Sequence, residues 1–329
     1  MRAGTRPASS KPRLLEPFRG KVLLGVLRFG VIRPEQFQES PSLWHRLLHG
    51  DRISYLLLRD ATPRLFEYIS AVLQLSSGVF RTTAPHRFAN LDPWILEAMQ
   101  QRWQPTDALE IHDMAASDGV TSVEWFTSIR SAFPVATMVS SDWSEALTEV
   151  STGSGSLIFD AQNEWIQYVK PPFVVRPREP RWMIFQRALS REGNALAAEA
   201  KLRIPQGKRV SLVHPKALAL AAQEPGFTLR RHSVFEPLDH PVHVIRTMNI
   251  LNPGYFPQEQ LRVGIGAVRK SLLPGGLWIL GRTLTDTNPP THRATMFERT
   301  TEGVRVVQQM HGGSEIENLA LENLAAETR

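Results

Sequence analysis

The chain has 329 residues, of which 42% are hydrophobic and 21% charged, so it can bury a sizeable core in one large domain or two small ones. It contains no cysteine, which excludes disulfides, thiolate metal sites and cysteine nucleophiles. No apolar run approaches the roughly 18 residues of a membrane-spanning helix, and the N-terminus lacks the apolar segment of a signal peptide. We therefore expect a cytoplasmic protein without a transmembrane segment.

The net charge of +6 is concentrated near the N-terminus. Residues 1–60 hold eleven Lys and Arg against five Asp and Glu, whereas the remaining residues hold 27 of each sign. The first 13 residues (MRAGTRPASSKPR) are typical of a disordered segment. Such a basic arm can contact an anionic surface and make the protein peripheral to a membrane, although a solvated tail is the simpler interpretation. We assign residues 1–84 to this arm and to following helices, broken near Pro63.

Residues 85–321 are predicted to form an α/β domain. Asp92 is expected to cap a helix that begins at Pro93 and ends near Pro105. A strand, a helix and a second strand that ends at Asp142 come next, and this alternation indicates a parallel sheet. The three segments are Leu109–Met114, Ser122–Phe133 and Val135–Ser140.

Residues 156–207 are predicted to be an insertion. Ser156–Phe159 and Trp165–Val169 flank a polar turn and indicate a hairpin. Residues 170–182 contain four prolines, which exclude regular structure, and a helix with Trp182, Phe185 and Leu189 follows. Because ligands bind at the carboxyl ends of strands in open α/β sheets, we expect this insertion to cover that end of the sheet and to shape a substrate site.

Alternating strands and helices resume after the insertion. Residues 301–303 are predicted to turn between the last two strands, which form an antiparallel hairpin. Residues 322–329 are assigned to a C-terminal tail. The expected strands are 209–213, 227–234, 243–248, 277–281, 296–299 and 304–310, and the expected helices are 215–222 and 257–272.

Two strand ends carry the residues that suggest a ligand site. Asp113 is followed by small residues at every second position, namely Ala115, Ser117 and Gly119, which let a ligand approach the backbone. The helix that follows offers free N–H groups to an anion. Asp142, at the end of the next strand, can accept both hydroxyls of a ribose or cap a helix over residues 143–150. The sequence Leu-Pro-Gly-Gly at 273–276 makes a sharp turn into a later strand.

In this order and spacing the features resemble class I S-adenosylmethionine-dependent methyltransferases, over residues 108–312. The resemblance implies a Rossmann-like, mostly parallel seven-stranded sheet in the order 3-2-1-4-5-7-6, with S-adenosylmethionine as cofactor. It implies that Asp113 holds the methionine ammonium group, that the backbone of Ala115, Ser117 and Gly119 lies along the methionyl part, and that Asp142 holds the ribose. Ala115 and Ser117 stand where the family motif has glycine.

The layout is most similar to chemotaxis-receptor-type glutamate methyltransferases, which also have a helical N-terminal part and an insertion between strands two and three. This resemblance implies that Arg246 and Asn249 lie near the transferred methyl group. Ser233 and Phe235 follow strand three, where the family holds adenine; Phe235 could stack on that base or belong to the core.

Three other interpretations remain. The sequence Asn-Pro-Gly-Tyr at 252–255 is similar to the motif of amino-group methyltransferases, or is a simple turn. A nicotinamide-dependent oxidoreductase would need more glycines than the loop at 115–119 holds. A catalytically degenerate binding or scaffold protein would tolerate the eroded glycine motif. The histidine spacings give no metal signature. The methyl acceptor, a general base and the oligomeric state cannot be inferred.

Overall fold

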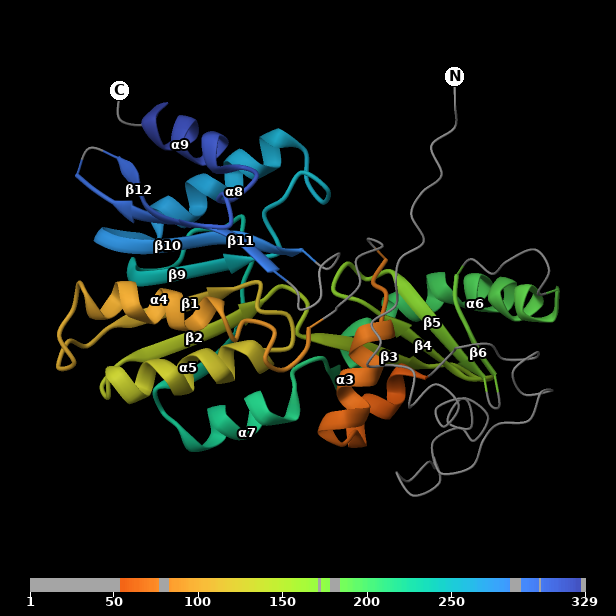
Figure 1. Cartoon of the computed structure of the whole chain (residues 1–329). Coiled ribbons are helices and arrows are strands. Elements are labelled where there is room, and N and C mark those ends of the chain that lie inside the picture. The colour runs from red at the N-terminus through yellow and green to blue at the C-terminus, as the bar shows by residue number, and fades with distance from the viewer. Residues whose placement is uncertain are drawn as a thin grey trace. The chain divides into compact units, whose positions relative to one another are not determined.

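The computed structural model describes residues 54–76, 83–170, 173–177, 184–284, 291–301 and 303–326. The expected basic arm lies almost entirely outside these residues. The chain divides into two compact units, one formed by residues up to Thr82 together with Ala146–Ser211, and the other by Thr83–Glu145 together with Leu212 onward. Figure 1 shows the elements of both units. In the described residues no helix is long and apolar enough to cross a bilayer.

The larger unit is built on a seven-stranded sheet in the order β12-β11-β10-β9-β1-β2-β8. Five neighbouring strands, from β8 to β10, are parallel, and β11 is antiparallel to both of its neighbours. The predicted mostly parallel sheet is therefore confirmed. The strands are β1 (Glu110–Met114), β2 (Thr137–Asp142), β8 (Phe227–Arg231), β9 (Val242–Met248), β10 (Leu272–Leu284), β11 (Thr291–Arg299) and β12 (Val304–Met310).

The strand order implied by the family resemblance is wrong at one edge. In the expected order 3-2-1-4-5-7-6 the last strand pairs with strand five, but here β11 pairs with β10 and β12 lies at the edge. Only residues 285–290 separate β10 from β11. A parallel crossover needs a dozen or more residues, so this short connection permits only an antiparallel neighbour. The predicted antiparallel hairpin of the last two strands is present as β11 and β12.

Helices cover both faces of this sheet (Figure 1). One buried cluster, which includes Trp125 and Met138, joins α4, α5 and α7 to the strands. A second cluster, which includes Ile265 and Trp278, joins α8 and α9 to the other face. We did not predict α9, which begins before the assigned tail and continues into it. The helices are α4 (Leu91–Gln100), α5 (Val120–Ala132), α7 (Pro215–Gln223), α8 (Gln258–Lys270) and α9 (Glu317–Ala326).

The smaller unit contains a five-stranded antiparallel sheet in the order β6-β5-β4-β3-β7. The predicted hairpin appears as β4 and β5, and Pro63 begins α3 as expected. Trp165 and Tyr168 pack against α6 in a core of their own. The elements are η3 (Tyr55–Asp60), α3 (Pro63–Val72), β3 (Ala146–Ser151), β4 (Ser156–Phe159), β5 (Trp165–Lys170), β6 (Phe173–Val175), α6 (Ile184–Leu202), η4 (Ile204–Gln206) and β7 (Lys208–Ser211).

Three predictions about this region are wrong. The proline-rich residues 170–182 do contain regular structure, because Phe173–Val175 form β6, which pairs with β5. Residues 143–150 do not form a helix, because β3 occupies Ala146–Ser151. The strand near residue 209 does not resume the parallel sheet; as β7 it pairs with β3 in the antiparallel sheet. The inserted unit therefore spans 146–211 rather than 156–207. The proposed cover over the parallel sheet concerns the placement of one unit on the other and stays a prediction, and Trp182 lies outside the described residues.

Candidate functional site

The loop between β1 and α5 has three residues in the left-handed backbone conformation at alternate positions. Ala115 has φ 56°, Ser117 has φ 62°, and Gly119 has φ 80°. Glycine adopts this conformation freely, whereas other residues incur a cost of about 1–2 kcal/mol. Ala115 and Ser117 are the positions where the resembling family has glycine. The loop thus has the left-handed backbone conformation that glycine favours at all three positions, although two of them carry a side chain.

Asp142 ties this loop to the neighbouring strand end. Its carboxylate accepts a hydrogen bond from the Ser117 backbone N–H at 2.9 Å and another from the Ser144 backbone N–H at 2.8 Å. No helix follows Asp142, so the interpretation of this residue as a helix cap is wrong. A carboxylate oxygen can accept more than one hydrogen bond, so these contacts are compatible with the expected ribose contact.

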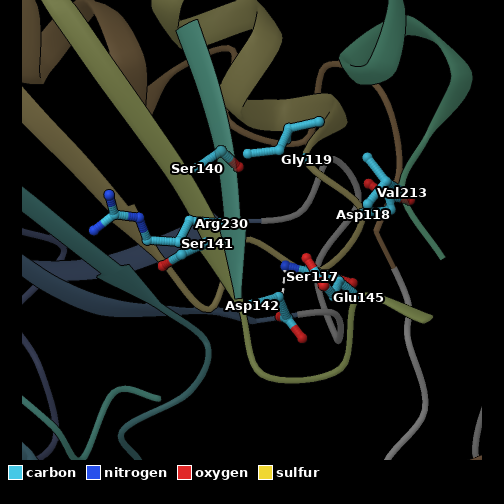
Figure 2. Close-up of a pocket in the computed structure, with 10 residues that line it drawn as sticks. Ser117, Asp118, Gly119, Ser140, Ser141, Asp142, Glu145, Val213 and Arg230 are labelled. Atoms are coloured by element: carbon cyan, nitrogen blue, oxygen red, sulfur yellow. Dashed lines mark hydrogen bonds between the residues drawn. The ribbon is translucent and has the colours of Figure 1, made fainter. Parts of the chain in front are cut away.

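A hollow of about 240 Å³, continuous with solvent, opens between this loop and the ends of β2 and β8. Figure 2 shows Ser117 and Asp142 joined by their hydrogen bond beside the hollow. The space that it encloses away from solvent is only about 10 Å³, roughly what one water molecule needs, so the hollow does not enclose a cofactor-sized ligand. It is lined by Ser117, Asp118, Gly119, Ser140, Ser141, Asp142, Glu145, Val213, Leu229 and Arg230.

Gly119 also packs closely against α7 and β2. A Cβ atom at this position would lie 3.2 Å from the Cβ of Ala217 on α7 and 3.4 Å from the Ser140 hydroxyl. Both the left-handed backbone and this close approach disfavour a side chain. The glycine that matches the family motif is therefore favoured by its left-handed backbone conformation and by close local packing.

Asp113 lies in a buried network of charges. Its carboxylate accepts two hydrogen bonds from Arg246, at 2.9 Å from Nε and 2.5 Å from Nη2, and a third from the Ser122 hydroxyl at 2.6 Å. The Nη1 atom of Arg246 donates to Asp92 at 2.7 Å. Arg246 is fully buried, and the relative exposures of Asp113 and Asp92 are 3% and 6%. Asp92, expected as a helix cap, instead lies inside α4, which begins after Asn90.

Aromatic rings and the two carboxylates set the electrostatics of this network. The Arg246 guanidinium lies 4.1 Å from the centre of the Trp125 ring and 4.9 Å from that of Phe88. Burial alone would lower the pKa of Arg246, but Asp113 and Asp92 raise it overall. Burial raises the pKa of Asp92 to about 7, Arg246 opposes this shift, and Asp113 adds to it. One arginine between two buried carboxylates leaves an excess negative charge that a proton on Asp92 removes.

The other predicted site residues do not line the hollow. Asn249 follows β9 with φ 64°, and its side-chain oxygen accepts a hydrogen bond from the Thr283 backbone N–H at 2.6 Å. Phe235 packs edge-on against Phe256 with ring centres 4.9 Å apart. Ser233 accepts a hydrogen bond from the Phe235 backbone N–H at 3.3 Å. Packing contacts thus account for Phe235, and the roles of Asn249, Ser233 and Phe235 toward a ligand stay predictions.

Sequence reasoning missed Ser122 and Ser140 and misjudged Asp92. Ser140 donates to the Ser122 hydroxyl at 2.8 Å, which extends the buried network to β2. A serine in a helix or strand gives no signal of its own, because only the pairing of distant segments brings these hydroxyls together. Asp92 before Pro93 does give a signal, but local sequence patterns favour a cap over a buried ion pair.

Two histidines are buried, His112 in the middle of β1 and His214 at the N-cap of α7. Burial lowers the pKa of His112 to about 3, and His112 Nε2 lies 2.7 Å from the Ser141 hydroxyl. Burial likewise lowers the pKa of His214 to about 4. Both side chains are therefore neutral at pH 7. Within the ranges that the structure describes, no group of three or more His, Asp or Glu side chains could hold a metal ion.

No family model and no curated protein matches the chain. Solved structures resemble it weakly. A sugar N-methyltransferase from Streptoalloteichus has 13% identity and a TM-score of 0.32, with 73% of this chain and 78% of that chain covered. An amino pentose methyltransferase from Micromonospora echinaspora, solved with S-adenosylmethionine, has 12% identity and a TM-score of 0.30, with 70% and 80% covered.

A candidate sarcosine dimethylglycine methyltransferase from Galdieria sulphuraria has 10% identity and a TM-score of 0.29, with 59% of this chain covered. The chain spans only 46% of that protein and 57% of a methyltransferase from Methanococcus maripaludis. Scores at this level carry no argument about function, so the functional case depends on the geometry above.

Proposed function

We propose that the larger unit binds S-adenosylmethionine and transfers its methyl group to an acceptor that is not yet identified. The observation that carries the proposal is the loop at 115–119. Three of its residues have the left-handed backbone conformation that glycine favours. The backbone N–H of one of them, Ser117, donates a hydrogen bond to Asp142 at the end of the next strand. The loop and Asp142 lie at the carboxyl ends of adjacent parallel strands, where open α/β sheets bind ligands.

The described residues fit such a cofactor in part. Asp142 would hold the ribose hydroxyls, and the backbone from Ala115 to Gly119 would lie along the methionyl part. When bound, the cofactor supplies an activated methyl group on a sulfonium. The chain then has to orient the acceptor, exclude water and, for an acceptor that must lose a proton, provide a base. Asn249, at the end of the central strand β9, is the residue we propose to face the acceptor.

A scaffold or binding protein without turnover is the second candidate, and two observations favour it. The Asp142 carboxylate already accepts two backbone hydrogen bonds. The hollow beside it is also smaller than a typical pocket for a ligand of this size. Both observations are consistent with a loop that has kept its backbone conformation but no longer binds the cofactor.

Calorimetry with S-adenosylmethionine, S-adenosylhomocysteine and NAD separates these candidates. The proposal predicts binding of both sulfur compounds in the micromolar range, equivalent to about −8 kcal/mol at 1 μM, and no binding of NAD. Binding of NAD alone would contradict the proposal. Absence of binding by all three would favour the scaffold. Transfer of a radiolabelled methyl group to candidate acceptors would then test turnover.

A further inference from the structure

We infer that Arg246 is a positioning residue, which fixes Asp113 and through it the cofactor loop, and that neither side chain contacts cofactor or acceptor directly. The inference rests on the proposed function. It replaces the roles that the family resemblance implies, in which Asp113 holds the methionine ammonium group and Arg246 lies near the methyl group.

Strand register and two hydrogen bonds fix Asp113 against Arg246. Arg246 on β9 is directly opposite Asp113 on β1. Its Nε and Nη2 atoms bind one carboxylate oxygen each, at 2.9 and 2.5 Å. A two-point contact of this kind fixes the orientation of both planar groups. Asp113 is thereby held near the end of β1, two residues before Ala115, where the loop begins.

The network continues from Asp113 to the far side of the loop. Ser122 in the first turn of α5 donates to Asp113 at 2.6 Å, and Ser140 on β2 donates to Ser122 at 2.8 Å. Ser140 is in turn one of the residues closest to Gly119. The loop at 115–119 is thus bracketed by two groups, Asp113 before it and Ser122 after it, that are bonded to each other.

Burial excludes a direct ligand role for these groups. Arg246 is fully buried, with the Trp125 ring 4.1 Å from its guanidinium, and Asp113 is 3% exposed. Both oxygens of Asp113 already accept hydrogen bonds from charged or hydroxyl donors inside the protein. A buried cation is stable only while its charged partners remain, so the network acts as a rigid support.

Asp92 makes this support sensitive to pH. The charged groups that act on it are Arg246 on β9, Asp113 on β1 and Glu124 on α5. Its pKa of about 7, raised by burial, means that it loses a proton in the neutral range. Arg246 binds the two carboxylates through different nitrogen atoms, so both stay bound, but an ionised Asp92 repels the nearby Asp113 carboxylate and disturbs its position. We therefore expect cofactor affinity to fall as pH rises through about 7.

The test measures the affinity of S-adenosylmethionine for three variants by calorimetry. Arg246→Lys removes the two-point contact, and we expect at least a tenfold loss of affinity. Ser122→Ala removes one donor to Asp113 and should cost several-fold. The matched control is Arg102→Lys, which alters the ion pair between Arg102 and Glu298, 2.7 Å apart, elsewhere in the same unit. This control should change the melting temperature but not the affinity.

Two readouts separate positioning from general stability. Hydrogen exchange of the amides at 115–119 should speed up in Ser122→Ala, with little change in the remaining core. The fall in affinity between pH 6 and 8 should disappear in Asp92→Asn. Wild-type protein that fails to bind S-adenosylmethionine would refute the proposed function itself. This inference alone would be overturned if wild-type protein binds S-adenosylmethionine and folded Arg246→Lys or Ser122→Ala binds it with the same affinity. An unchanged pH profile in Asp92→Asn would also overturn it.

Discussion

Replacing Asp142 with alanine tests the centre of the proposed site. The carboxylate accepts hydrogen bonds from the backbone N–H groups of Ser117 and Ser144, at 2.9 and 2.8 Å. Asp142→Ala therefore removes two loop contacts and the proposed ribose contact together. A hydrogen bond to a charged group contributes about 1.5–3 kcal/mol. We expect the ribose contact alone to weaken S-adenosylmethionine binding by this amount, or roughly 10- to 150-fold.

The effect on folding is expected to be of similar size but is measured separately. Two unsatisfied amides at a half-buried position cost about 1–3 kcal/mol, because water can satisfy them only in part. Asp142→Asn should lose less in both measurements, since an amide oxygen still accepts hydrogen bonds. The assay is calorimetry for affinity and urea denaturation for the free energy of unfolding, on the same three proteins.

A matched control comes from the smaller unit. Asp160 also accepts backbone hydrogen bonds, from Ser76 at 2.9 Å, Gln162 at 3.1 Å and Glu164 at 3.2 Å. Asp160→Ala should therefore lower the free energy of unfolding without changing the affinity for S-adenosylmethionine. Unchanged affinity in a folded Asp142→Ala protein would refute the reasoning, and Asp142 would then be only a support for the loop.

Three further predictions follow from the loop and the buried network. Because burial raises the pKa of Asp92 from 3.8 to about 7, its stabilising contribution is present below about pH 4 and is lost progressively up to about pH 7. The advantage of Asp92→Asn over wild type in the free energy of unfolding should therefore grow by on the order of 2–3 kcal/mol between pH 5 and 8. Gly119→Ala, at φ 80° and with the new Cβ 3.2 Å from Ala217, should lose about 1–2 kcal/mol of stability in urea denaturation, and stability within experimental error of wild type would contradict the structure of the loop. Ser117→Gly relieves the left-handed strain but adds freedom to the unfolded chain, so stability should rise by no more than about 1 kcal/mol, while calorimetry should find unchanged affinity because the bond to Asp142 comes from the backbone.

Much of the fold could be predicted because it depends on local sequence patterns. The alternation of apolar and polar residues located all five neighbouring parallel strands to within a few residues, except that β10 extends beyond the predicted Leu277–Gly281 in both directions. Pro63 marked the start of α3, and the small residues after Asp113 marked the loop. These features depend on residues within one turn or one strand of each other, so each short segment carries its own signal.

Strand partners required the tertiary structure. The sequence near residue 209 reads equally well as a parallel or an antiparallel strand, and only its pairing with β3 places it in the smaller unit. The short connection that sets the strand order at β11 became visible only in the structure, because the predicted strands 277–281 and 296–299 were too short and left room for a crossover. A strand presents the same hydrogen-bonding groups to any neighbour, so its own sequence says little about which neighbour it has.

The candidate site was likewise predictable from the sequence only in part. The sequence alone determined that Asp113, Asp142 and the small residues between them lie at two strand ends. Only the tertiary structure decided that Asp113 is bound by Arg246, which is 133 residues away, and that Asp92, 154 residues from Arg246, completes the network. The physical reason is that the free energy of a buried charge depends on the partners that surround it in space, and those partners come from separate elements that no local pattern connects.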